Sequence, residues 1–106
     1  MDIQLKRGLL DVCVLSAIQD GETYGYKILK DLRPYTEMSE STLYTILKRL
    51  ENCDMLTVRA AEHCGRLRKY YNITEKGLSR ISEFTSDWSE VKKLYNFIIK
   101  ENIENE

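Results

Sequence analysis

Residues 39–73 read SESTLYTILKRLENCDMLTVRAAEHCGRLRKYYNI, and this stretch decides the fold. Its first part places apolar residues at helical spacing, within one arc of a helical wheel: Leu43, Ile46, Leu47 and Leu50. Ser39 is the expected N-cap of this helix, which we predict to end near Asn52. Two short runs, 55–60 and 67–73, then alternate between apolar and polar residues, which predicts a two-stranded hairpin with Gly65 in its loop.

The outward face of the predicted helix is small, hydroxylated and basic. Opposite the apolar arc lie Ser41, Thr45, Lys48 and Asn52, with Tyr44 and Arg49 on the shoulders. Short side chains allow a helix backbone to approach another surface closely. Hydroxyl, amide and ammonium groups bond to phosphates and to base edges, so this face suits a nucleic acid.

Positive charge is concentrated in the same part of the chain. The net charge is −1, but residues 41–80 carry 8 basic and 4 acidic groups, against 5 and 7 in residues 1–40 and 3 and 6 in residues 81–106. The second strand begins with Arg66, Arg68 and Lys69, so the hairpin tip is cationic. A basic centre between acidic ends favours a localised site for a polyanion, although a solvated face accounts for the same charges.

Two further helices are expected before this stretch. Residues 3–18 are apolar on more than one side, which predicts a helix buried against more than one neighbour. We predict the second helix over residues 23–33, with Thr23 as its N-cap and Pro34 as its end.

The C-terminal part predicts one long helix, from Thr74 to about Ile103. Its apolar stripe is spaced by alternating steps of three and four residues: Ile81, Phe84, Trp88, Val91, Tyr95 and Ile98. A helix of about thirty residues spans ~45 Å and overhangs a small domain. Packing on the chain's own core accounts for the first two turns. For the rest, we predict a homodimer interface.

Other classes of protein are poorly supported. A chain of 106 residues forms one domain, and no apolar run approaches the ~20 residues of a membrane span. The N-terminus lacks a signal-peptide pattern, and an odd set of three cysteines (Cys13, Cys53, Cys64) favours a cytoplasmic location. Neither a nucleophile–base pair, a glycine-rich phosphate loop nor metal-ligand spacing around His63 is present. We therefore expect no enzyme, no metal and no cofactor.

Together these elements predict a mainly α fold with a small β-hairpin, that is, a winged helix-turn-helix followed by a long C-terminal dimerisation helix. We expect residues 1–73 to form the DNA-binding domain and residues 74–106 the dimerisation helix, within one compact unit. The third helix would read base edges in the major groove while the hairpin, as the wing, neutralises phosphates. A winged-helix module that binds another protein and not DNA is the alternative.

The sequence also resembles the PadR family of bacterial transcriptional regulators, in particular its short branch and the multidrug-binding members of that branch. The resemblance runs from Gly8 to about Ile98. It rests on residues 8–10 (GLL) with 14–15 (VL), 21–26 (GETYGY), 41–44 (STLY) with 49–51 (RLE), and above all 65–71 (GRLRKYY) and 74–77 (TEKG). Asp54 departs from the family pattern, which usually has glycine there, but aspartate tolerates left-handed geometry.

The resemblance implies a cytoplasmic homodimeric repressor that binds a palindromic DNA operator. By position it places at or near the DNA a set of helix and wing residues: Ser41, Thr42, Tyr44, Thr45, Lys48, Arg66, Arg68, Lys69, Tyr24, Tyr26 and Lys27. Of the neighbours Tyr70 and Tyr71, strand alternation lets only one point outward, and we predict that Tyr71 points inward.

Trp88, the only tryptophan, lies at the middle of the apolar stripe. The resemblance implies that two copies of this residue bind an aromatic small molecule at the dimer centre, lined also by Phe84, Asp87 and Val91. Asp87 and Glu90 would attract a cationic ligand. Simple packing of Trp88 in the dimer interface is the competing interpretation.

Overall fold

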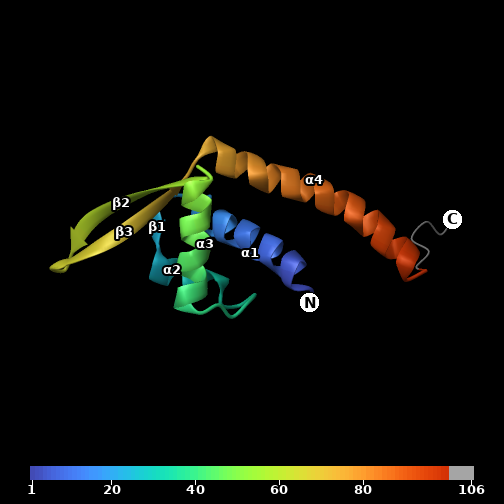
Figure 1. The fold of residues 1–106 in the computed structure, drawn as a ribbon, viewed down its shortest axis with the longest axis horizontal. Coiled ribbons are helices and arrows are strands. Elements are labelled where there is room, and N and C mark those ends of the chain that lie inside the picture. Colours follow the sequence, from blue (N-terminus) through green and yellow to red (C-terminus); the bar gives the residue numbers. More distant parts are fainter. Residues whose placement is uncertain (101–106) are drawn as a thin grey trace.

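The computed structural model describes residues 1–100 and contains a small helical body, an antiparallel sheet and a long final helix. The elements follow as α1 (Ile3–Ile18), β1 (Thr23–Tyr24), α2 (Gly25–Leu32), α3 (Glu40–Asn52), β2 (Leu56–His63), β3 (Arg66–Ile73) and α4 (Glu75–Ile98). Figure 1 shows α4 and the β2–β3 hairpin leaving the body of α1, α2 and α3 on opposite sides. The predicted mainly α winged-helix fold is confirmed.

The core forms where α1, α2 and α3 meet the base of the sheet. Its most deeply buried side chains come from each of these elements: Val14, Leu15, Ile18, Ile28, Leu43, Leu47 and Leu56. The bounds of α3 agree with the prediction, since the Ser39 hydroxyl accepts a hydrogen bond from the Thr42 backbone N–H at 3.1 Å. The core therefore fixes which face of α3 points outward.

The start of the second helix was predicted wrongly. Thr23 is not its N-cap but pairs with Tyr71 in a third strand, and the sheet order is β1-β3-β2. Helix α2 begins two residues later, at Gly25, with Tyr24 as its N-cap. A strand of two residues has no alternation to detect, so its long-range pairing with β3 gave no local signal.

The hairpin is longer and its turn is tighter than predicted. Residues 61–63, expected in the loop, extend β2, and a two-residue turn of Cys64 (φ 52°) and Gly65 (φ 81°) joins the strands. Positive φ at both positions matches the twist of the flanking strands. Two predictions are confirmed: Tyr71 is only 4% exposed, and Asp54 adopts left-handed geometry with φ 62°.

Helix α4 begins in the core and ends in solvent. At Gly77 an added Cβ would overlap the Met55 carbonyl oxygen and lie 2.6 Å from Ile73 Cγ1, so the helix start presses on the sheet. Ile81, which we expected in a dimer interface, packs partly buried on the chain's own core. The helix ends at Ile98, short of the predicted Ile103, because Lys100 turns left-handed (φ 59°); residues 101–103 lie outside the described part.

Candidate nucleic-acid interface

The polar face of α3, defined as Ser41, Thr45, Lys48 and Asn52, is exposed along its length. The Thr45 hydroxyl donates to the Ser41 carbonyl at 2.9 Å, which keeps this side chain close to the helix surface. Of the other predicted contacts, Tyr44 is about half exposed, whereas the Thr42 hydroxyl accepts a hydrogen bond from Ser39 Oγ at 3.0 Å. Because Ser41 and Thr45 are short, a partner can approach the helix backbone there closely.

Tyr44 owes its position to a glycine. A Cβ added at Gly25, the first residue of α2, would lie 2.6 Å from the Tyr44 hydroxyl oxygen. The tyrosine ring therefore lies across the start of α2, at the inner end of a groove of about 730 Å³ between α2, α3 and the hairpin. We call β2, β3 and their turn the wing.

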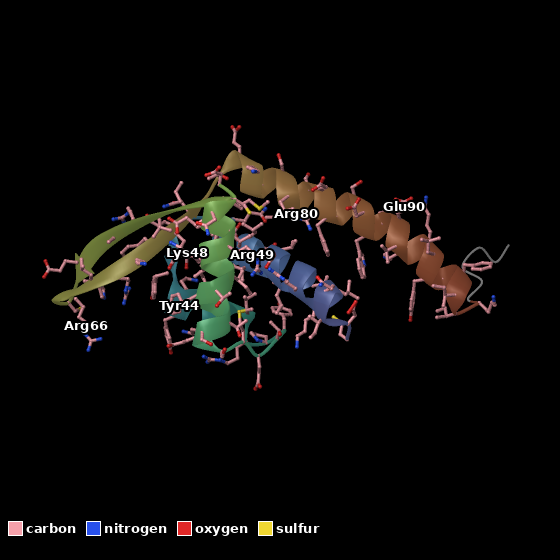
Figure 2. All side chains as sticks on the ribbon, in the orientation of Figure 1. Tyr44, Lys48, Arg49, Arg66, Arg80 and Glu90 are labelled. Atoms are coloured by element: carbon pink, nitrogen blue, oxygen red, sulfur yellow. The ribbon has the colours of Figure 1, made fainter. Side chains whose placement is uncertain are left out.

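The wing carries its cations on two faces. By strand alternation Arg66, Arg68 and Tyr70 share one face, and Leu67, Lys69 and Tyr71 share the other. Lys69 lines a second groove, of about 290 Å³, together with Tyr44 and Lys48 of α3. Figure 2 shows Arg66 extending from the wing tip, and this residue lines the larger groove together with Tyr44.

Arg68 differs from Arg66 and Lys69 because tyrosine rings hold it. Its guanidinium carbon lies 3.9 Å from the centroid of the Tyr24 ring and 5.9 Å from that of Tyr70. The two rings meet edge to face at 6.0 Å. Arg68 is half-buried, whereas Arg66 and Lys69 are exposed. Arg66 and Lys69 are thus exposed cations, whereas tyrosine rings hold Arg68.

A polar cluster that sequence reasoning missed braces the wing from the same face as Arg68. Glu22 accepts two hydrogen bonds from Arg59, at 2.6 and 2.7 Å, and one from the Asn72 amide at 2.8 Å. These bonds, Arg59 foremost, lower the pKa of Glu22 to about 2. The Arg59 guanidinium also lies 4.7 Å from the Tyr70 ring centroid. Only long-range strand pairing brings these residues together, so a local pattern could not reveal them.

The remaining predicted contacts lie at the start of α2. Tyr26 is exposed, and Tyr24, which we expected within the helix, belongs to β1. The Lys27 ammonium group donates to Asp31 at 2.9 Å, and this bond raises the pKa of Lys27. The charge of Lys27 is therefore already paired with Asp31, one helical turn later.

The apolar stripe of α4 stays uncovered in its second half. Trp88 is 39% exposed, Val91 40%, Tyr95 56% and Ile98 69%, and we call these four residues the distal face of α4. Phe84, partly buried, stacks on Trp88 with ring centroids 5.9 Å apart and planes 16° apart. Asp87 is exposed beside them. Glu90, which we expected to attract a ligand near Trp88, instead extends from the side of α4 that points away from α1 (Figure 2).

Two negative findings concern residues 1–100. No group of three or more His, Cys, Asp or Glu side chains there is placed to hold a metal ion. None of the helices in this part of the chain combines the length and hydropathy that a membrane crossing requires.

The chain is similar to known transcriptional regulators along most of its length. Residues 14–83 match the Transcriptional regulator PadR-like family. An uncharacterized protein of Lysinibacillus sphaericus is 32% identical over 99 residues, which cover 89% of this chain and 91% of that protein. The crystal structure of a PadR family transcriptional regulator from Eggerthella lenta DSM 2243 aligns with a TM-score of 0.83 and 29% identity, covering 94% of this chain and 89% of that one.

A further similarity concerns the fold alone. Bacillus subtilis PadR, whose crystal structure was determined in complex with operator DNA, aligns with a TM-score of 0.68 and 22% identity. The alignment covers 73% of this chain and 46% of that one.

Proposed function

Because the chain belongs to the PadR-like family of transcriptional regulators, whose members are regulators and not enzymes, we propose that it is a homodimeric repressor of transcription. In this proposal it binds a palindromic DNA operator through α3 and the wing. Residues 1–73 act as the DNA-binding part and residues 74–106 as the dimerisation helix.

One observation carries the DNA-binding proposal: exposed cations of the wing line the grooves that α3 borders. Tyr44 and Lys48 share a groove with Lys69, and Arg66 extends beyond it. A helix in the major groove with a cationic ribbon beside it divides base reading from phosphate binding. Ser41, Thr42 and Thr45 would then lie at the base edges, and Tyr24, Tyr26 and Lys27 near the backbone.

The distal face of α4 supports the dimer. Exposed apolar patches of this extent on a soluble protein mark interaction surfaces, and a two-fold dimer makes the surface of one copy cover that of another. In such a dimer the two α3 helices would read half-sites ~34 Å apart, or a multiple of that distance.

Two measurements on the full chain test the proposal. Selection of duplexes from a random-sequence pool identifies the DNA that it binds, and sedimentation of the protein gives its oligomeric state. We expect a dimer that enriches an inverted repeat and whose affinity falls steeply with salt, since phosphate contacts release counterions. A well-folded dimer that enriches no sequence and shows no salt-dependent DNA binding would contradict the proposal and favour the protein-interaction module.

The stacked pair Phe84 and Trp88 favours a second role, that of a chemical sensor. The stack presents a partly exposed aromatic surface at the centre of the proposed dimer, with Val91 beside it and the exposed Asp87 carboxylate next to Trp88 in the sequence to favour a cation. We propose that a planar aromatic molecule bound there releases the repressor from DNA. Quenching of Trp88 fluorescence by a panel of planar aromatic cations is the test. Because Trp88→Ala lacks the only tryptophan, calorimetry measures its ligand affinity, and an unchanged affinity would refute the site.

A further inference from the structure

A groove of about 480 Å³ separates α3 from the first half of α1, on the side of α3 opposite the wing. Its polar lining consists of Lys6 and Arg7 from α1 and Ser41, Thr42, Thr45 and Arg49 from α3. Ser41 and Thr45 also belong to the polar face of α3. The groove is therefore continuous with the surface that we propose to contact the bases in the major groove.

The charge of the groove has one sign. Arg49, at its floor, forms an ion pair with Asp11 of α1, so its charge is already matched and the pair fastens the two helices together. Lys6 and Arg7 are exposed, and neither belongs to an ion pair found among residues 1–100. No carboxylate lines the groove. The two α1 cations are therefore available to an anion.

The position of these cations relative to α3 indicates which anion. Figure 2 shows Lys48 on the wing side of α3 and Arg49 on the α1 side. A helix in the major groove, which is about 12 Å wide, has a phosphate strand along each border. The cations of the wing lie near one border, whereas Lys6 and Arg7 of α1 line the groove near the other.

We propose that Lys6 and Arg7 bind the phosphate backbone of the DNA strand that borders α3 on the side away from the wing. This inference rests on the proposed DNA-binding function and adds a second phosphate clamp to it. The two clamps together hold α3 from both sides, which fixes the angle at which its polar face meets the bases. The Asp11–Arg49 ion pair keeps α1 at the distance from α3 that this clamp requires.

Salt titration of the full chain on a duplex selected by the wild-type protein measures the clamp. The double variant Lys6→Ala/Arg7→Ala is expected to reduce the slope of log affinity against log salt by ~1.8 for each bound subunit, because each lost phosphate contact reduces it by ~0.9. Lys93→Ala is the matched control, since it removes an exposed cation from α4, outside the α1–α3 groove. Its slope is expected to equal that of the wild type.

A second measurement locates the contacts. Ethylation of individual phosphates is expected to block wild-type binding at positions on both borders of each α3, and the double variant loses only the positions away from the wing. The second double variant, Lys6→Gln/Arg7→Gln, removes the same charges but retains long, helix-forming side chains. The same loss of contacts in this variant would show that the effect is not caused by a folding defect. If the double variant showed the slope and the ethylation pattern of the wild type while Arg66→Ala still reduced the slope, the α1 clamp alone would be overturned. Failure of the wild-type protein to select any duplex would overturn the proposed function and the clamp with it.

Discussion

The protein exposes two surfaces: one is formed by α3 together with the wing, and the other is the distal face of α4. They differ in chemistry and in how their side chains are held. The first is polar and basic, and several of its side chains are held within the chain, as in the stack of Arg68 on Tyr24 and the bonds of Arg59 to Glu22. The second is aromatic and aliphatic, and its one such contact among the described residues is the stack of Phe84 on Trp88.

This difference indicates that the two surfaces have separate partners. Water solvates a polar surface at little cost, so α3 and the wing are stable before DNA arrives. An apolar surface gains roughly 25 cal/mol for each Å² that is removed from water, so the distal face of α4 is stabilised only when another apolar surface covers it. Under the proposal the dimer is therefore the resting state, and DNA binding follows dimerisation.

The largest expected effect is that of Val91→Asp, which places a charge at the centre of the distal face. An unpaired charge buried in an interface costs several kcal/mol, so we expect the dimer dissociation constant to rise at least ~100-fold. Sedimentation equilibrium measures the change, and binding to the selected duplex should fall with it. Ser89→Asp, two residues earlier and off the stripe, is the control; a Val91→Asp protein that remains dimeric would mean that the interface lies elsewhere, for example on α1.

Gly77→Ala tests the junction between the two surfaces. The new Cβ would overlap the Met55 carbonyl oxygen and the Ile73 side chain, so the backbone of the sheet or of α4 has to shift. Overpacking of this kind destabilises by ~1–3 kcal/mol, which urea unfolding measures. Gly8→Ala makes the same change in α1, where an added Cβ meets no atom within 4 Å, and should leave the stability at or above that of the wild type. Equal unfolding free energies for the Gly77→Ala and wild-type proteins would show that α4 does not press on the sheet.

The same comparison explains how much of this molecule could be predicted from sequence. Helix α3 was predicted with correct bounds because its cap, its apolar arc and its polar face are all local features. The stripe of α4 was equally clear. Its end was not, since Ile98 and Ile99 continue the apolar pattern and the left-handed geometry of Lys100 ends the helix without glycine or proline.

Features that depend on distant pairing were missed. Thr23 has the character of an N-cap, but its pairing with Tyr71 makes it a strand residue. The Glu22–Arg59–Asn72 cluster joins residues that are up to 50 positions apart. The residue types on the wing predicted three equivalent cations, whereas only the fold distinguishes Arg68 from Arg66 and Lys69.

The difference between Arg68 and the exposed wing cations predicts a smaller effect, which appears in the salt dependence of DNA binding for one variant and in stability for the other. Lys69→Ala should reduce the salt slope of DNA binding by ~0.9 per subunit and leave stability unchanged. Arg68→Ala removes the stack on Tyr24 and should lower the unfolding free energy by about 0.5–1 kcal/mol with a smaller change of slope. Arg66→Ala is the comparison for an exposed cation at the tip. If Arg68→Ala and Lys69→Ala gave the same pair of results, the tyrosine rings would not be holding Arg68.

The smallest expected effect concerns the brace of the wing and its dependence on pH. Folding lowers the pKa of Glu22 from 4.5 to about 2, so the bonds to Arg59 and Asn72 contribute their full stability above pH 4.5 and lose it as the pH falls toward 2. The unfolding free energy of the wild type should therefore exceed that of Glu22→Gln by a constant amount above pH 4.5, and the difference should shrink below it. Because solvent reaches this cluster, the difference is small and decreases with salt.

Glu62→Gln provides the control for this measurement, because it removes an exposed carboxylate from the wing that forms no ion pair among the described residues. Its difference from the wild type, measured at the same pH values, gives the baseline for the loss of one wing carboxylate. A Glu22→Gln difference that stayed constant between pH 6 and pH 3 would mean that Glu22 titrates alike in the folded and unfolded chains. The wing would then be held by its strand pairing and tyrosine stack alone, and the polar surface would lack one of the internal contacts that distinguish it from the distal face of α4.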